Sequence, residues 1–544
     1  MGTRQDLWLP AGGAVIILSF VALVYCFTGQ FESRQLYAKQ ARAFKDRQAA
    51  LEIPVPPQLP KLSDPYDPIQ NAPYRINDAS LYRGHWYLYF SPVPAVLFYL
   101  PIALLGGELT DAIALVALTI AFFALLVPLV RRLLADGSSH PEGGSTSLRL
   151  RLATFGSVAA IGATSGVLFL LRRPEIYEVA IAAGVVFFLA HCVLLQRLLT
   201  ETAPNLLLTA AAGIAMALAV GSRINYLPIA AIFLMITAGK LSWHGGRGRT
   251  ILIVLAAAAP LFVVLTGLGA YNYLRFGSIQ ENGLTYQLGG LDHETQRTVV
   301  SDLRLGPFPD VVYHTLLHPP TFSSRFPFID VNRDFEPDAI RREHGVITAE
   351  QQVGALPINP ALTLGAIVGA VVLARSRKHR PPLTRAGPFG GLRSALGSPA
   401  GGRGLFLGYL AASSVVLFLI PSGLYGGWSQ RYAAEYLWPA TSVAVCALAM
   451  FYRSARSYHT KTAVFSVSAV SLLVGTIAWL LISSGGYIPV PDASAPIVQR
   501  LGENTALLAI LGVMLLAIVI AISVVSGRRP SELTTEATPT EPAR

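Results

Sequence analysis

The chain has 544 residues, of which 53% are hydrophobic and only 13% are charged. Soluble globular proteins carry about 25% charged residues, so this composition excludes an ordinary water-soluble protein. The net charge is +11, but the basic residues are grouped between apolar segments, so they indicate membrane topology rather than nucleic-acid binding. Cys26, Cys192 and Cys446 lie in or beside apolar segments without metal-ligand spacing, and they predict neither a zinc site nor a disulfide framework.

Apolar runs long enough to cross a bilayer recur along the chain and predict an all-α polytopic membrane protein with about twelve transmembrane helices. The first run follows Arg4 and has no small-x-small cleavage site after it, so we expect it to remain as a span. The segment 92–107 is short and holds three prolines, so we expect it to lie along the membrane surface. The expected spans are 9–27, 109–130, 152–171, 175–195, 205–221, 224–240, 251–271, 358–374, 404–421, 434–452, 463–483 and 506–526.

The distribution of charge between the two sides orients these spans. With both termini in the cytoplasm, the inner side holds 22 basic and seven acidic residues, a net charge of +15. The outer side then holds 20 basic and 24 acidic residues, a net charge of −4. Because Lys and Arg are enriched in cytoplasmic loops, this partition supports the twelve-span orientation.

The expected organisation is one transmembrane domain over residues 1–526 with two large outer loops, 28–108 and 272–357. Both loops are rich in aromatics, prolines and carboxylates, so we expect function to lie there. The second loop is expected to pack over the first and to form the acceptor side of a site. The cytoplasmic loop 375–403 and the tail 527–544 lack hydrophobic periodicity and are expected to be flexible.

Ionisable residues collect at the outer ends of the expected helices rather than near the bilayer midplane, where a secondary transporter places them. His191 lies toward the inner end of its span and is interpreted as a tolerated lone histidine rather than a proton relay. Carboxylates and guanidinium groups at one membrane face suit a reaction between a membrane-held phosphate donor and a polar acceptor. Interfacial anchors and loop ion pairs are the alternative interpretation.

The segment FESRQLYAKQARAFKDRQAALEIPVP, directly after the first span, resembles the first outer loop of GT-C glycosyltransferases of the aminoarabinose-transferase and protein O-mannosyltransferase type. In that family an acidic pair followed by Arg begins an amphipathic surface helix, whereas the pair here reads Phe31-Glu32. The stretch SDPYDPIQNAPYRINDASLYRGHWYLYFSPVPAVLFYLPIALL resembles the second half of that loop in a bacterial branch of the family. RRPEIYE, YNYLRFGS and GGWSQRYAAEYLWP are similar to further GT-C segments, so the resemblance covers most of residues 1–440.

The resemblance implies a GT-C-like fold in the bacterial plasma (inner) membrane and transfer of a sugar from a polyprenyl-phosphate donor. The expected partners are that lipid-linked donor, the bilayer, and a glycan, lipid or protein acceptor at the outer face. No Gly-rich nucleotide-binding fingerprint is present, which agrees with a lipid-linked rather than a nucleotide-linked donor. No nucleic-acid partner is expected, because the basic residues are explained by membrane topology. We expect no organic cofactor, and a divalent cation is compatible with the carboxylates of the first loop. A non-catalytic transport or assembly protein for lipid-linked glycans, or a pseudo-enzyme, are the alternatives.

The resemblance places an Asp or Glu of the first loop at the reacting centre, and the candidates are Glu32, Asp64 and Asp67. Glu32 follows the first span by about two helical turns, near the level of a lipid phosphate. The DPYDP motif that holds Asp64 and Asp67 is also typical of two Asp-Pro turns. The binding candidates are Asp78, Arg172, Arg173, Glu175, Arg223, Arg275, Arg431 and Tyr432. The alternative for Asp78 is a cap of a local turn, and for the others it is anchoring at the interface.

The expected orientation can be tested by labelling single cysteines in intact cells. Cysteines introduced at Ser63 and Thr295 should react with an impermeant thiol reagent added outside, and one at Ser394 should not. The opposite labelling pattern would contradict the expected orientation and place the two large loops in the cytoplasm.

Overall fold

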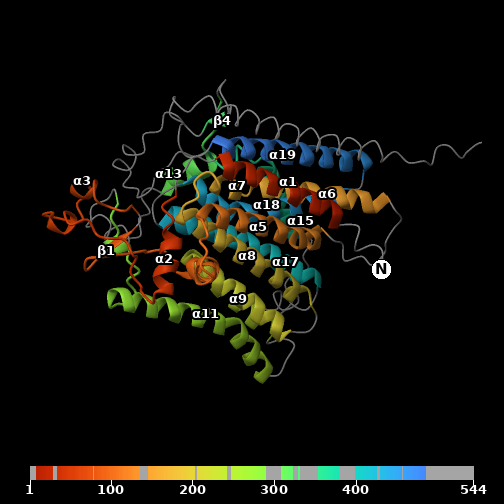
Figure 1. Cartoon of the computed structure of the whole chain (residues 1–544). Helices are drawn as coiled ribbons and strands as arrows, with labels where there is room; N and C mark the ends of the chain where they lie inside the picture. The colour runs from red at the N-terminus through yellow and green to blue at the C-terminus, as the bar shows by residue number, and fades with distance from the viewer. Residues whose placement is uncertain are drawn as a thin grey trace, which may run out of the picture.

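A computed structural model gives the fold of the chain. It describes residues 8–28, 33–77, 79–134, 145–201, 205–241, 247–289, 308–322, 329–330, 353–378, 399–424, 429–455 and 457–485. Long helices form a bundle, and α2, α3, β1 and α13 gather at one end of it (Figure 1). The expected span 506–526, the tail 527–544 and most of the cytoplasmic loop 375–403 lie outside the described residues.

Apolar composition gives rise to the long helices of the bundle, because a helix satisfies its own backbone hydrogen bonds in lipid. Eleven of the expected spans overlap a described helix of 15 residues or more. These helices are α1 (Trp8–Thr28), α5 (Asp111–Leu134), α6 (Ser145–Thr164), α8 (Ile176–Thr200), α9 (Leu206–Ser222), α10 (Leu227–Leu241), α11 (Arg247–Phe276), α15 (Pro360–Lys378), α17 (Pro399–Phe418), α18 (Ala433–Ser454) and α19 (Tyr458–Gly485).

Among the described residues, six helical stretches are both long and apolar enough to cross a membrane, so the chain is a membrane protein. They are Asp111–Leu134, Ile176–Thr200, Ile251–Phe276, Gly401–Pro421, Gln430–Ser454 and His459–Ser483. Five of the other expected spans overlap shorter apolar helices, and the sixth, 506–526, lies outside the described residues. The total of about twelve spans stays a prediction.

One expected span, 152–171, is interrupted in the structure. Helix α6 ends at Thr164, and α7 (Val167–Leu170) begins after Gly166, whose φ is +79°. A Cβ at Gly166 would lie 3.0 Å from the backbone nitrogen of Ala434 at the start of α18. The close approach of α18 and the left-handed backbone at Gly166 together explain the break, because only glycine accepts both without strain.

The segment 92–107 holds two short helical pieces, η3 (Ala95–Tyr99) and α4 (Leu100–Leu104), which are too short to span a bilayer. They pack against α2 (Leu36–Lys45), the amphipathic helix that the resemblance implied after the first span. The rest of the first outer loop contains η2 (Leu59–Lys61), α3 (Pro68–Asn71) and the antiparallel hairpin of β1 (Ser80–Tyr82) and β2 (His85–Tyr87).

The described beginning of the second outer loop packs against the first loop, as expected. Ser80 pairs with Gln287 in a β-bridge, and the Ser80 hydroxyl donates a hydrogen bond to the carbonyl of Gly283. The ring of Tyr286 lies 4.6 Å from that of Tyr82, centroid to centroid. The remaining described elements of this loop are η5 (Leu284–Tyr286), α13 (Phe308–Val312), η6 (Tyr313–Leu317) and the two-residue strands β3 (Thr321–Phe322) and β4 (Ile329–Asp330).

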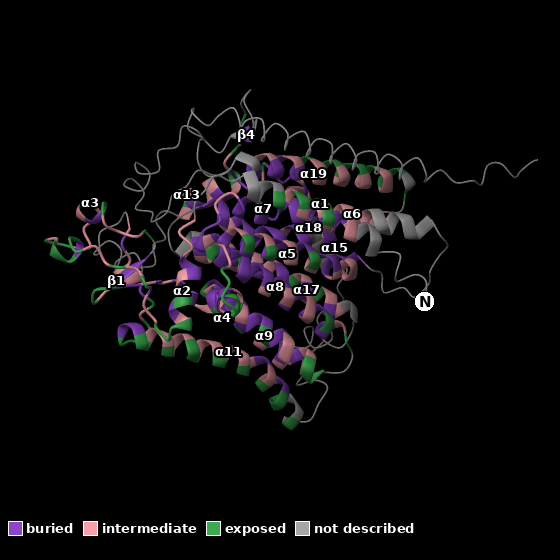
Figure 2. Ribbon diagram, in the orientation of Figure 1, coloured by how far each residue is buried: buried purple, intermediate pink, exposed green. Residues whose placement is uncertain are grey.

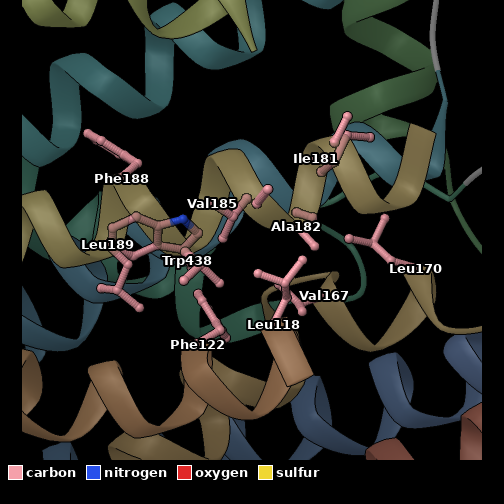
Figure 3. Packing of buried hydrophobic residues seen from close by; sticks show 14 of the residues in the cluster. Leu118, Phe122, Val167, Leu170, Ile181, Ala182, Val185, Phe188, Leu189 and Trp438 are labelled. Atoms are coloured by element: carbon pink, nitrogen blue, oxygen red, sulfur yellow. The ribbon is translucent and has the colours of Figure 1, made fainter. Parts of the chain in front are cut away.

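The core of the bundle forms around α8, which packs against α5, α9, α17 and α18. Figure 3 shows Phe122, Val185 and Phe188 around Trp438, whose ring is fully buried. Helix α11 lies at the edge of the bundle and carries many exposed apolar side chains, including Phe262 and Val263 (Figure 2). An exposed apolar face of this kind is suited to lipid contact.

The lone histidine of α8 has a structural role, in agreement with the sequence. Nδ1 of His191 lies 2.9 Å from the carbonyl oxygen of Ala212, and Nε2 lies 3.0 Å from the Tyr409 hydroxyl. Cys192 and Cys446 are buried free thiols.

The contact between α15 and α18 requires a glycine at one position and tolerates alanine one turn later. A Cβ at Gly365 would lie 2.4 Å from the Cβ of Ala444, whereas a Cβ at Gly369 would lie 3.9 Å from the Cβ of Ala447. Gly365→Ala should therefore destabilise the protein by about 1–3 kcal/mol through overpacking. Gly369→Ala, the matched control, should be neutral or stabilising. Thermal unfolding in detergent measures both, and equal melting temperatures would contradict this helix contact.

Candidate functional site

Polar side chains from both the first loop and the helix ends meet where α5 begins. The buried carboxylate of Asp111 accepts hydrogen bonds from the Ser33 hydroxyl at 2.5 Å and the Tyr99 hydroxyl at 2.6 Å. The backbone N–H of Asp111 donates to Oε1 of Gln35 at 2.9 Å. The start of a helix favours a negative charge, so Asp111 is well placed to hold the first loop against α5.

The backbone adopts an unusual conformation at Gln35. Its φ is +52° and its ψ is +43°, the left-handed region, which costs a non-glycine residue on the order of 1 kcal/mol or more. The conformation lets Gln35 receive the N–H of Asp111 while its own N–H donates to the Ser33 hydroxyl at 3.1 Å. Hydrogen bonds to Ser33 and Asp111 thus fix Gln35, immediately before α2, in a strained backbone conformation.

An ion pair between Arg223, whose side chain is 16% exposed, and the fully buried Glu435 joins the end of α9 to the start of α18. Nε of Arg223 lies 3.2 Å from Oε1 of Glu435, and a terminal nitrogen of Arg223 lies 3.0 Å from Oε2. Burial alone lowers the pKa of Arg223, but the Glu435 carboxylate outweighs burial and raises it, so the guanidinium stays charged. Two of the five N–H groups of the Arg223 guanidinium are used, and its side chain makes no other hydrogen bond to the described residues.

A second arginine of the same region lies among aromatic rings. A terminal nitrogen of Arg431 is 3.8 Å from Oε1 of Glu178, in the first turn of α8, and both side chains are buried. Its guanidinium lies 4.5 Å from the ring centroid of Tyr177. Tyr432 is shared by the two arginines, with its ring 5.6 Å from the guanidinium of Arg431 and 5.9 Å from that of Arg223. The two cations therefore lie on a common aromatic surface.

Glycine in α8 makes room for this arrangement. A Cβ at Gly184 would lie 2.8 Å from Cε2 of Tyr226 and 3.2 Å from Cγ of Arg223. The ring of Tyr226 and the stem of Arg223 can thus pass directly over the α8 backbone. α8, the helix at the centre of the core, therefore also contacts the stem of Arg223, one partner of the Arg223–Glu435 pair.

At the end of α11, Arg275 fixes the loop rather than joining these pairs. Its guanidinium lies 3.9 Å from the ring centroid of Tyr271, and it donates to the Leu88 carbonyl and to Oδ1 of Asn272. The Tyr271 hydroxyl in turn accepts from Gln40 of α2 at 2.9 Å. The candidate binding residue Arg275 is therefore placed between the first loop and α11.

The structure places the remaining candidates in different surroundings. Glu32 and Asp78 lie outside the described residues. Asp64 accepts the N–H of Tyr66, and Asp67 caps α3, which lies at the edge of the first loop away from the bundle (Figure 1). The half-buried Arg172 and Arg173 and the buried Glu175 lie in the turn before α8, next to the start of the helix that carries Glu178.

The choice of candidates from sequence omitted the buried acids of this region: Asp111, Glu178 and Glu435. Each is in the first turn of a predicted span, a position where a carboxylate is favoured by the helix dipole and close to the membrane surface. That position is the sequence signal that could have identified them. Within the described residues, no group of three His, Cys, Asp or Glu side chains is arranged to hold a metal ion.

No family model and no curated protein sequence matches the chain. Its fold is similar to solved structures of the oligosaccharyltransferase of Archaeoglobus fulgidus: the apo form, a form tethered to an acceptor peptide, and AglB with an inhibitory peptide and a dolichol-phosphate. Identities are 13%, 13% and 12%, TM-scores are 0.44, 0.43 and 0.42, and the matches cover 91%, 92% and 91% of this chain. The chain spans 59% of the length of these solved structures.

The buried ion pair should respond to loss of one charge far more than an exposed pair does. Glu435→Gln leaves Arg223 buried without its counter-ion and should cost roughly 3–5 kcal/mol. Glu108→Gln is the matched control, because Glu108 pairs with Arg42 and both side chains are 50% exposed, which predicts a cost of about 1 kcal/mol or less. Unfolding in detergent measures the difference, and equal costs would contradict the burial of the Arg223–Glu435 pair.

Proposed function

We propose that the protein is a membrane glycosyltransferase that moves a sugar from a polyprenyl-phosphate-linked donor to an acceptor at the outer face of the membrane. The observation that supports this most directly is the group of buried charges at the loop end of the bundle. Glu435, Arg431, Glu178 and Asp111 are buried, and the partly buried Arg223 pairs with Glu435. All five residues lie at helix ends and come from segments far apart in the chain. Buried charges so close to a membrane surface are expensive and are typically functional.

The arginines provide the chemistry for the phosphate side of the reaction. Guanidinium groups bind phosphate oxygens through several N–H donors and remain charged at any physiological pH. Arg223 keeps side-chain N–H groups that no described residue accepts. The Tyr432 ring lies close to the guanidinium groups of both Arg223 and Arg431. As the bond between the sugar and the phosphate oxygen breaks, these cations would stabilise the negative charge that the departing phosphate gains.

We propose Glu32 as the general base. Its neighbour Ser33 is bonded to the buried carboxylate of Asp111, so the backbone next to Glu32 is held at the start of α5. In this position Glu32 would take the proton of the acceptor hydroxyl as that oxygen attacks the sugar carbon. Asp111, which already accepts two hydroxyl hydrogen bonds, would act by positioning this segment. The hydrogen bonds of Asp64 and Asp67 to nearby backbone amides support the turn interpretation of the DPYDP motif.

Transport is supported less well than transfer by the described residues. The buried histidine of α8 has a hydrogen-bond partner at both nitrogens and offers no relay for protons. The buried ion pairs described above lie at helix ends rather than halfway along the helices. A pseudo-enzyme would keep the same scaffold, and an assay of transfer separates it from an enzyme.

Glu32→Gln should lower the rate of transfer by about 10²- to 10⁴-fold, the usual cost of losing a general base, without changing expression or melting temperature. The measurement is sugar transfer by purified protein from a panel of polyprenyl-phosphate sugars. Asp67→Asn is the matched control, because asparagine also caps helices well, so its folding should be unchanged. Asp64→Asn provides the same test for the neighbouring turn.

Two outcomes would argue against the proposal. Full activity of Glu32→Gln would show that Glu32 is not the general base. Full activity of Glu32→Gln, Asp64→Asn and Asp67→Asn would exclude all three candidate carboxylates of the first loop from the mechanism. No turnover by the wild-type protein with any lipid-phosphate sugar, while the lipid still binds, would favour a transport protein or a pseudo-enzyme.

A further inference from the structure

The Tyr37 side chain of α2 combines complete burial with an unused hydroxyl. Its relative exposure is 0%, and its ring packs against that of Tyr99 with 5.7 Å between centroids. The hydroxyl has no hydrogen-bond partner among the residues that the structure describes. The neighbouring Tyr99 differs in this respect, because its hydroxyl donates to Asp111. A buried polar group without a partner is rare in folded proteins and calls for an explanation.

Tyr37 lies near both Asp111, at the start of α5, and Arg223, at the end of α9. Burial raises the pKa of its phenol, the nearby Asp111 carboxylate raises it further, and the nearby Arg223 guanidinium lowers it. The phenol therefore stays protonated and is available as a donor at any physiological pH. Asp111 accepts from Ser33 and Tyr99 instead, and Arg223 has only donors to offer. Neither neighbour uses the hydrogen of the Tyr37 hydroxyl.

The surroundings of Arg223 contain a second hydroxyl of the same kind. The hydroxyl of Tyr226 is also buried and has no hydrogen-bond partner within the described part of the chain. Arg223 itself retains N–H groups that the bidentate contact with Glu435 does not use. The Tyr226 ring and the stem of Arg223 both pass over Gly184, and the Tyr37 phenol is close enough to Arg223 for the guanidinium to lower its pKa. Unused donors around one guanidinium are suited to an acceptor that carries several oxygens and a negative charge.

We propose that Tyr37 is a binding residue whose hydroxyl donates a hydrogen bond to the phosphate of the lipid-linked substrate, beside Arg223. The inference rests on the proposed function and adds a residue and a ligand group to it. The phosphate supplies the acceptor that the hydroxyl lacks, while the Arg223 guanidinium balances its charge. Phosphate binding would then explain why the Tyr37 hydroxyl has no hydrogen-bond partner among the described residues.

The proposal predicts opposite effects of Tyr37→Phe on stability and on binding. Loss of an unpartnered buried hydroxyl should leave the melting temperature of the free protein equal to or above that of the wild type. Loss of a hydrogen bond to a charged ligand should weaken binding of a polyprenyl monophosphate by about 10- to 100-fold. If the hydroxyl had only a structural role, Tyr37→Phe would lower the melting temperature and leave the affinity of the folded protein for polyprenyl monophosphate unchanged.

The experiment uses the full chain purified in detergent. Binding of a polyprenyl monophosphate is titrated for the wild type, Tyr37→Phe and Tyr99→Phe, and the melting temperature of each protein is measured without ligand. Tyr99→Phe is the matched control, because it removes a hydroxyl that donates to Asp111 and should lower the melting temperature. Polyprenol without a phosphate tests whether the headgroup is required, and inorganic phosphate tests whether the lipid is required.

A normal or raised melting temperature together with weaker binding of the polyprenyl phosphate would support the role of Tyr37. Unchanged affinity of Tyr37→Phe, or a melting temperature as low as that of Tyr99→Phe, would overturn it and leave the proposed function intact. Equal binding of polyprenol, or equally strong binding of inorganic phosphate, would overturn the assignment of a lipid phosphate. No binding of polyprenyl phosphate by the wild type would overturn both this inference and the proposed donor.

Discussion

The buried ion pair of Arg223 and Glu435 is the interaction on which the arrangement of the site depends. It joins residues 212 positions apart in the chain and fixes the end of α9 against the start of α18. Charges of this kind are costly within hydrocarbon and are weakly held in water, so a close pair requires helix ends that are covered by protein. α2, the β1–β2 hairpin and the start of the second loop are the described elements that gather at this end of the bundle.

The positions of the helices could be predicted from the sequence because burial in lipid is a property of each apolar run by itself. The break at Gly166 could not be predicted in this way, since it depends on the approach of α18 from elsewhere in the chain. The same limit applies to the site. Arg223 and Arg431 were recognisable as outer charges, but their partners Glu435 and Glu178 follow only from which helix ends lie side by side.

The carboxylates of the first loop show how geometry separates two interpretations that composition leaves open. Asp64 and Asp67 each precede a proline, a pattern typical of turns and equally compatible with a paired-carboxylate site. In the structure their oxygens accept backbone N–H groups of the following turn, which is the role that local chain geometry favours. Ser33 and Gln35 carried no such signal, although they connect the first loop to Asp111.

Two local energetic costs lie close together where α2 begins. Gln35 adopts a left-handed backbone, and two residues later Tyr37 buries a hydroxyl that no described residue accepts. The interior around α8 consists largely of close-packed apolar side chains and offsets such local costs without being near them. Strain and unsatisfied groups persist in folded proteins where function requires them. Packing alone would favour a relaxed residue at 35 and phenylalanine at 37, so a bound substrate would account for both costs at the start of α2.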